Sequence, residues 1–230
     1  MPSERDNYAR VQEWAQVPCG MTLFGVADMK PLVSTLAGVS GSTRTRCRSA
    51  VSLGVPLLNS VIDDIEDHPT ALYVHHYRQV NYLLDRAALT LSSLIQEQGA
   101  WAMPIGASQI IDWQNLTAHI SHREVAAAAG LGWWGRNNLL VHPRYGSRIR
   151  LVTVLTDLPL CHDQPHPGNC GTCRRCLDIC PANAIHEQRE QFDLAACTEQ
   201  LRTFKKRHNL PHYVCGLCIR ACAGPNGPVP

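Results

Sequence analysis

Eight cysteines in the last third of the chain have the spacing of iron–sulfur ligands. Four of them form a C-x2-C-x2-C-x3-C run that ends in Cys-Pro, and they are Cys170, Cys173, Cys176 and Cys180. A single Cys197 follows, and then Cys215, Cys218 and Cys222 form a C-x2-C-x3-C motif. In two-cluster bacterial ferredoxins the fourth cysteine of such a run ligates the other cluster. The spacing therefore predicts two 4Fe–4S clusters that exchange a ligand between the two motifs.

The expected ligand sets follow from this exchange. One cluster is expected on Cys170, Cys173, Cys176 and Cys222, and the other on Cys180, Cys197, Cys215 and Cys218. Two structural zinc ions are an alternative, but zinc knuckles rarely carry a third cysteine at the same spacing or a closing Cys-Pro. Disulfides are disfavoured, because residues 1–10 are polar and lack the apolar region of a signal peptide.

Composition narrows the class of protein. The 230 residues, 45% of them hydrophobic, can bury a real core, and no apolar stretch reaches membrane-spanning length. A net charge of +2 argues against a strongly basic nucleic-acid surface. Eleven cysteines without a signal peptide predict a reducing compartment, the cytoplasm. The three outside the array, Cys19, Cys47 and Cys161, are expected to be buried small residues or surface thiols.

Two domains are expected, an α/β body over residues 1–160 and a ferredoxin-like α+β domain over 161–230. Two prolines and a glycine in residues 161–169 mark the boundary. In the body, an amphipathic helix is expected at residues 77–95 with Gly99 after its end, and a capping box of Ser121 and Glu124 opens a second helix that runs to Ala129. The expected strands are residues 48–53, 72–76 and 101–105, and residues 139–156 are expected to form a β-hairpin.

The glycine-rich segment 130–141, GLGWWGRNNLLV, resembles the core of epoxyqueuosine reductases. The PRYG sequence at 143–146 and the cysteine array with its lone Cys197 resemble that family too, as do residues 48–54. Reductive dehalogenases share the same plan more distantly. The resemblance implies a nitroreductase-like body that cradles cobalamin, and two clusters that relay electrons to cobalt.

The resemblance also implies that the glycine-rich turn contacts the corrinoid. The residues expected to do so are Gly130, Gly132, Trp133, Gly135, Arg136 and Asn137. Glycine permits positive φ and a close approach of the backbone to a large planar ligand, and Trp133 with Trp134 would add an apolar wall. The alternative is a glycine that ends a helix, followed by two core tryptophans, which needs no ligand.

The proton donor of such a reductase is less evident. The family's aspartate is expected after the strand at 101–105, where this sequence has Gly106, Ala107 and Ser108. The remaining candidates are Asp112, His119 and His122. Histidine is readily poised near neutral pH, but the start of a helix favours the neutral imidazole at His122 and weakens it as an acid. An ordinary hydrogen-bonded histidine is the alternative for both.

Two functions fit these expectations. The first is a corrinoid-dependent reductase of a small molecule, supplied by an electron donor of the flavodoxin or ferredoxin type, with electrons passing through the Cys215-containing cluster and then the Cys170-containing one. The alternative is an electron-transfer protein whose α/β body docks a partner or senses a ligand without a corrinoid. A tRNA substrate is not expected, because the net charge is small and no helical-repeat region follows Cys222.

Overall fold

The computed structural model describes residues 2–112 and 116–224, and the chain divides into two compact units. Unit 1 comprises residues 1–55, 81–131 and 150–166, and unit 2 comprises residues 56–80, 132–149 and 167–230. The chain passes from unit 1 to unit 2 for the last time at residues 166–167, close to the boundary expected at residue 161. Two earlier segments also belong to unit 2, however, so the units alternate along the sequence.

Unit 1 is built on a four-stranded sheet with the strand order β1-β2-β6-β3. Strands β1 (Leu23–Asp28) and β2 (Ser49–Pro56) pair antiparallel, and so do β3 (Ala102–Ile105) and β6 (Ile149–Thr156). Both β2 and β6 are buried along almost their whole length, as expected of strands covered on both faces. The mixed helix-and-sheet class expected of the body is confirmed.

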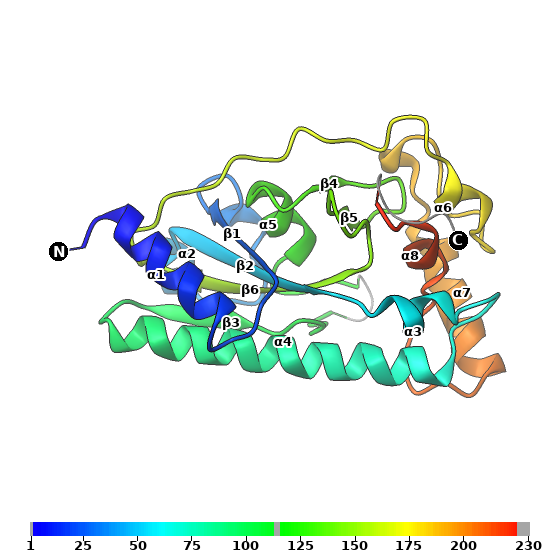
Figure 1. The fold of residues 1–230 in the computed structure, drawn as a ribbon, viewed down its shortest axis with the longest axis horizontal. Coiled ribbons are helices and arrows are strands. Elements are labelled where there is room, and N and C mark those ends of the chain that lie inside the picture. Colours follow the sequence, from blue (N-terminus) through cyan, green and yellow to red (C-terminus); the bar gives the residue numbers. More distant parts are fainter. Residues whose placement is uncertain (1, 113–115, 225–230) are drawn as a thin grey trace. The chain divides into compact units, whose positions relative to one another are not determined.

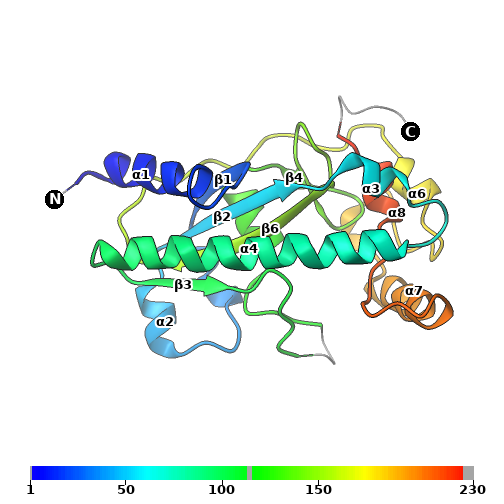
Figure 2. The same cartoon turned by 60° about the horizontal axis from the view of Figure 1, so that its bottom comes forward.

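Helices cover the two faces of this sheet. The helices of unit 1 are α1 (Glu4–Gln16), the 3-10 turn η1 (Val33–Thr35), α2 (Gly41–Arg46), α5 (His122–Ala128) and the second part of α4 (Ala71–Glu97). Figures 1 and 2 show α5 on one side of the sheet and α4 on the other. Val125 of α5 is fully buried in a cluster with Ala27 and Leu155. Gly25 of β1 permits this close packing, because a Cβ there would overlap the Ala129 carbonyl oxygen.

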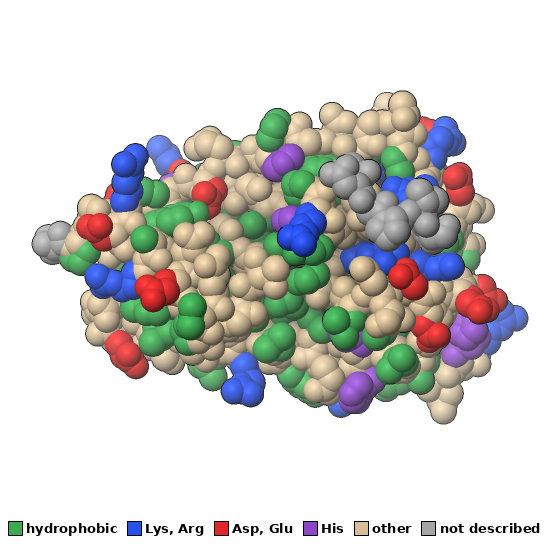
Figure 3. Space-filling model, in the orientation of Figure 1, with side chains coloured by type: hydrophobic (Ala, Val, Ile, Leu, Met, Phe, Trp, Pro, Cys, Tyr) green, Lys and Arg blue, Asp and Glu red, His purple; other side chains and the backbone are tan. Residues whose placement is uncertain are grey.

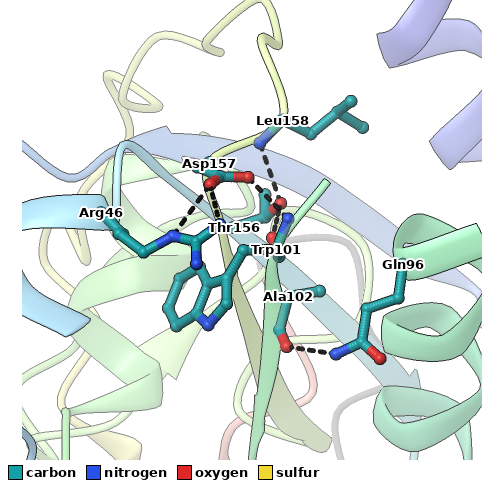
Figure 4. Close-up of polar contacts among 7 residues, drawn as sticks. All are labelled: Arg46, Gln96, Trp101, Ala102, Thr156, Asp157 and Leu158. Carbon is teal, nitrogen blue, oxygen red and sulfur yellow. Dashed lines mark hydrogen bonds and ion pairs between the residues drawn. The ribbon is translucent and has the colours of Figure 1, made fainter. Parts of the chain in front are cut away.

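A polar network holds the start of β3 in unit 1 (Figure 4). Asp157 accepts hydrogen bonds from Arg46 Nη2 at 2.8 Å and from the Trp101 N–H at 2.7 Å. Thr156 Oγ1 donates to the Trp101 carbonyl at 2.6 Å. Because both backbone groups of Trp101 are satisfied by residues that end β6, this network fixes the register of β3 against β6.

Unit 2 consists of short elements around the cysteines. They are α3 (Asn59–Asp63), β4 (Trp133–Trp134), β5 (Leu140–Val141), α6 (Arg175–Asp178), the 3-10 turn η2 (Arg189–Gln191), α7 (Leu194–Arg207), α8 (Leu217–Ala221) and the first part of α4. Figure 1 shows α6 beside α8, with which it packs. The Asp193 side chain caps α7 by accepting the Ala196 N–H at 2.8 Å.

Several sequence predictions of local structure are confirmed. Helix α4 contains the expected residues 77–95 and ends before Gly99, which has φ +82°. The Ser121 side chain caps α5 by accepting the Glu124 N–H at 3.3 Å. Strands β2 and β3 lie where strands were expected, and residues 161–170 contain neither helix nor strand.

Two predicted β elements are wrong. Residues 72–76 form the first turns of α4, because Thr70 Oγ1 accepts the Tyr73 N–H at 3.1 Å and starts the helix there. The hairpin predicted over residues 139–156 does not form, since β5 pairs with β4 and β6 pairs in the four-stranded sheet. β6 is eight residues long and buried at seven of them, and burial of this kind is available in the four-stranded sheet.

The surface carries both signs of charge. On the face shown in Figure 3, acidic and basic side chains are interspersed, in keeping with a net charge of +2. Among the described residues, no helix combines the length and the apolar character needed to cross a membrane. Cys19 and Cys47 are buried and Cys161 is half-buried, as expected for thiols outside the array.

Candidate metal centre

The first cysteine run folds into successive turns in unit 2. The Cys173 N–H donates to the Cys170 carbonyl at 3.1 Å, and the Cys180 N–H donates to the Leu177 carbonyl at 3.2 Å. Cys176 lies between these turns on α6. Cys173 is exposed and the other three cysteines are half-buried. Turns of this kind let thiols two residues apart face one ligand, as a cluster requires.

A glycine with positive φ positions the second cysteine motif. Gly216 has φ +88° and begins α8, on which Cys218 lies. A Cβ at Gly216 would lie 2.6 Å from Ile65 Cδ1, so a side chain would meet both an unfavourable φ and a steric overlap. Cys197 lies in the first turn of α7, next to the capping residue Asp193.

The thiols of the first expected set influence the pKa of Cys176. Burial raises the pKa of Cys176 to about 12, and three further thiols add to that rise. These thiols belong to Cys170, Cys173 and Cys222. Such effects fall off with distance, which supports assigning these four cysteines to one set. One of them, Cys222, comes from the distant C-x2-C-x3-C motif, and the exchange of ligands between the motifs stays a prediction.

The second expected set shows the same pattern. Burial raises the pKa of Cys215 to about 11, and Cys197 and Cys180 add to the rise. Burial also raises the pKa of Cys218, and the neighbouring thiols that contribute are Cys215, Cys197, Cys176 and Cys180. Cys218 therefore neighbours its own set and also Cys176 of the first set. Ligation by these cysteines stays a prediction.

Arginine changes the environment of one thiol in the first set. Burial acts to raise the pKa of Cys173, but hydrogen bonds from Arg175 and the charges of Arg175 and Arg136 outweigh burial and lower it. A lowered pKa favours the thiolate, the form that binds iron. Among the described residues, no group of three or more Cys, His, Asp or Glu side chains lies close enough to hold a single metal ion. A 4Fe–4S cluster requires thiols that lie further apart than the ligands of a single ion, because its four thiolates bind four different iron atoms.

Arg136 binds the backbone of the first cysteine loop. Its guanidinium donates to the carbonyls of Gly171 and Cys173 at 2.8 Å each, and its Nε donates to the Glu187 carbonyl at 2.8 Å. The side chain is only 17% exposed and also pairs with the Glu187 carboxylate at 3.3 Å. The sequence predicted a corrinoid contact for Arg136. In the structure this side chain binds the backbone of the loop that carries Cys170 and Cys173.

A second turn holds the last cysteine. The Ser147 N–H donates to the Cys222 carbonyl at 3.0 Å. The preceding Gly146 has φ +59°, and a Cβ there would overlap that same carbonyl oxygen. Arg148 donates to the Arg220 carbonyl at 2.6 Å and pairs with Asp63 at 2.8 Å, with its side chain 3% exposed. The PRYG motif of the sequence therefore leads into a support for α8 and Cys222.

The glycines of the predicted corrinoid turn are explained by packing within each unit. Gly130 has φ +73°, and a Cβ there would lie 2.6 Å from the Gln164 carbonyl oxygen. At Gly132 a Cβ would overlap the Val141 carbonyl oxygen, where β4 meets β5. At Gly135 it would lie 2.6 Å from Asn137 Oδ1. These glycines admit the protein's own backbone and side chains, and they need no ligand to account for them.

The other residues of the turn are also engaged. Asn137 is buried, donates to Ser147 Oγ at 3.0 Å and accepts the Leu139 N–H at 3.2 Å. Trp133 and Trp134 are half-buried on β4, and the Arg189 guanidinium lies 4.3 Å from the centre of the Trp134 ring. A corrinoid contact of this turn remains a prediction, and these contacts do not supply an open cradle for it.

His122 is a half-buried, hydrogen-bonded histidine in unit 1. Its Nε2 faces the Gly106 carbonyl at 2.9 Å, and its Nδ1 faces Thr153 Oγ1 at 2.8 Å. Because a carbonyl oxygen only accepts, Nε2 carries the proton and Nδ1 of the neutral ring accepts from the hydroxyl. Burial lowers its pKa more than the Gly106 hydrogen bond raises it. The neutral form expected at this helix start is thus favoured, with burial as the main cause.

The other candidate acids are half-buried as well. His119 Nδ1 lies 2.9 Å from the Ala37 carbonyl, which assigns the proton to that nitrogen. Asp112 is half-buried and forms an isolated antiparallel bridge with Thr117. Residues 113–115, between these two, lie outside the described residues. The three candidates all belong to unit 1, but they have separate hydrogen-bond partners.

Comparison with known proteins supports an iron–sulfur centre. Residues 169–224 match a family model described as a 4Fe-4S double cluster binding domain. An epoxyqueuosine reductase of Gloeobacter violaceus is 46% identical over 116 residues, covering 46% of this chain and 36% of that protein. One from Bacillus anthracis is 40% identical over 81 residues, covering 35% of this chain and 21% of that protein. The resemblance to epoxyqueuosine reductases is confirmed, and the matches cover only about a fifth to two fifths of these relatives.

Solved structures share the fold at low sequence identity. A catabolic reductive dehalogenase in complex with 3-bromo-4-hydroxybenzoic acid has a TM-score of 0.76 and 18% identity, over 96% of this chain and 32% of that chain. An epoxyqueuosine reductase from Streptococcus thermophilus has a TM-score of 0.58 and 19% identity, over 96% of this chain and 68% of that chain. Another, solved with a tRNA-Tyr stem loop, has a TM-score of 0.56 and 20% identity, over 93% of this chain and 64% of that chain.

Proposed function

We propose that this protein is an iron–sulfur reductase with two 4Fe–4S clusters that supply electrons for the reduction of a small molecule. The observation that carries the proposal is the match of residues 169–224, which contain all eight cysteines, to a 4Fe-4S double cluster binding domain. Each cluster, when bound, takes up and releases one electron at a time. An external flavodoxin or ferredoxin is the proposed donor.

The chain's own residues prepare the two sets. The first set would be Cys170, Cys173, Cys176 and Cys222, and the second Cys180, Cys197, Cys215 and Cys218. Buried thiols resist ionisation, and coordination to iron keeps them deprotonated without a nearby base. Arg136 and Ser147 hold the backbone on either side of the first set, so its thiols are oriented before iron binds.

A corrinoid belongs to the proposal on narrower grounds. The dehalogenase whose fold this chain shares was described in terms of B12-dependent dehalogenation. No residue of the glycine-rich turn is given a role in corrinoid binding, since packing and hydrogen bonds already engage them. His122 would serve in the body as a neutral hydrogen-bonding residue rather than as an acid.

Anaerobic reconstitution tests the clusters. The chain is loaded with iron and sulfide, desalted and analysed for iron, acid-labile sulfide and zinc. The expected result is two clusters' worth of iron and sulfide with broad absorbance in the blue. A colourless protein that retains zinc in place of iron would remove the basis of the proposal.

Retention of cobalamin distinguishes a corrinoid-dependent reductase from an electron-transfer protein. Cobalamin is added before desalting, and a stoichiometric cob(II)alamin spectrum is expected for a corrinoid-dependent reductase. A protein that keeps both clusters but no cobalamin would instead match an electron-transfer protein. A tRNA anticodon stem loop, tested at physiological salt, is not expected to bind, because the net charge is only +2. Tight binding of the stem loop would contradict the small-molecule substrate.

A further inference from the structure

The two cysteine sets differ in the charges beside them. Two arginines, Arg136 and Arg175, contact the backbone or thiols of the first set. Beside the second set, the Asp193 carboxylate accepts the Ala196 N–H at 2.8 Å, one residue before Cys197, and Arg220 lies between Cys218 and Cys222. The first set thus has an excess of positive charge beside it, whereas beside the second set the Asp193 carboxylate offsets Arg220.

Arg136 is held in place beside the first loop. Two of its nitrogens donate at 2.8 Å to the carbonyls of Gly171 and Cys173, so the guanidinium cannot turn away from the loop. The Glu187 carboxylate partly offsets its charge, but that carboxylate also pairs with Arg174 and is itself 47% exposed. Three arginines, Arg136, Arg174 and Arg175, and two carboxylates, Glu187 and Asp178, leave a net positive charge beside this loop.

Arg175 points to an acceptor that the polypeptide does not provide. It lies between Cys173 and Cys176 in the sequence, and its Nη2 reaches the Gly224 carbonyl at 3.5 Å. Its Nη1 is buried and, among the described residues, has no hydrogen-bond partner. A buried N–H is normally paired, and sulfur of a cluster held by the flanking cysteines would provide the acceptor.

We propose that Arg136 and Arg175 place the reduction potential of the first cluster above that of the second. This inference rests on the proposed function, because it requires a cluster on each set. Reduction adds one negative charge to a cluster, which nearby cations and N–H···S hydrogen bonds stabilise and a carboxylate opposes. The first cluster is therefore the one reduced first, whichever partner delivers the electron.

An EPR-monitored redox titration of the reconstituted full chain tests this order. Two midpoint potentials are expected. Arg136→Gln and Arg175→Gln should each lower the higher midpoint by about a tenfold change in the one-electron equilibrium, which is 59 mV, and leave the lower one in place. Arg202→Gln is the matched control, because Arg202 is exposed and pairs with Glu199 on α7. It should move neither midpoint.

Arg136→Lys separates charge from hydrogen bonding. Lysine keeps the positive charge but cannot bridge two carbonyls with a planar fork. The higher midpoint should stay close to that of the unchanged protein, while a chelator removes iron from the first cluster faster. If Arg136 only braces the loop, Arg136→Gln will speed iron loss without moving a midpoint, and the inference fails for this residue.

The Cys197→Ala variant assigns the midpoints. It is expected to retain only the first cluster, and that cluster must show the higher of the two midpoints. The inference is overturned if the retained cluster has the lower midpoint, or if both glutamine variants hold full iron and move neither midpoint. Failure of the unchanged protein to take up iron and sulfide is a different result, which refutes the proposed clusters before any titration.

Discussion

Distant parts of the chain bind the loop backbone of the first cysteine set directly, whereas they reach the second set through α8, on which Cys218 lies. Arg136 and the turn at Gly146 and Ser147 grip the first set from segments before the cysteine run. The second set relies on the cap of α7 by Asp193 and on the turn at Gly216. The difference shows that two sets of cysteines with the same spacing can be held by different residues and can have different charges beside them.

Cys197→Ala should have the largest effect on this comparison. It removes a ligand that only the second set uses, so iron and sulfide content should fall to about half while the EPR signal of the first cluster persists. Iron analysis and EPR of the reconstituted variant measure this. Full retention of both clusters would show that the ligand sets are assigned wrongly.

Gly146→Ala should damage the first set through its support alone. The left-handed φ of +59° and the overlap with the Cys222 carbonyl together should cost roughly 3 kcal/mol and speed iron loss from the first cluster. Urea unfolding and chelator kinetics give the two readouts. Gly171→Ala is the matched control, because its φ is +51° but the nearest atom lies 4.0 Å away. It should cost only about 1 kcal/mol. Equal effects of the two variants would argue against the support at Cys222.

Asp193→Asn should have a smaller effect, on the second set. Asparagine caps a helix about as well as aspartate, so stability should hardly change. Loss of the carboxylate should raise the lower midpoint and narrow the gap between the clusters, by less than the arginine variants because Asp193 is exposed and screened. Redox titration checks the shift. An unchanged or lower midpoint would show that this carboxylate does not act on the second cluster.

Local spacing made the cysteine array predictable. The cysteines that bind a 4Fe–4S cluster are spaced by two or three residues. This local spacing indicates cluster ligands in Cys170 to Cys180 and in Cys215 to Cys222. Helix α4 and the cap at Ser121 were predictable for the same reason, since their signals lie within a few turns. The strand predicted at residues 72–76 failed because a short apolar run is ambiguous without its cap at Thr70.

Contacts between distant segments were not predictable. Arg136 acts on carbonyls 35 and 37 residues away, and nothing in its own neighbourhood indicates those partners. The glycine-rich turn attracted a ligand-based interpretation because glycine spacing does not say what approaches the backbone. At Gly132 and Gly135 the approaching groups belong to the protein itself. Arg175 between two cysteines was a visible signal of a charged neighbour, but its burial required the structure.

The support of Cys222 by Ser147 has a consequence for how the protein is made. Translation delivers residues 146–147 long before Cys222, so the backbone N–H that receives this last cysteine is synthesised first. An assembly factor acting on the nascent chain would meet a site with three thiols of the first set before the fourth is synthesised. With Cys222 as the proposed fourth ligand, that ligand would arrive at a turn already in the chain, and cluster closure would coincide with completion of α8 rather than with emergence of the first cysteines.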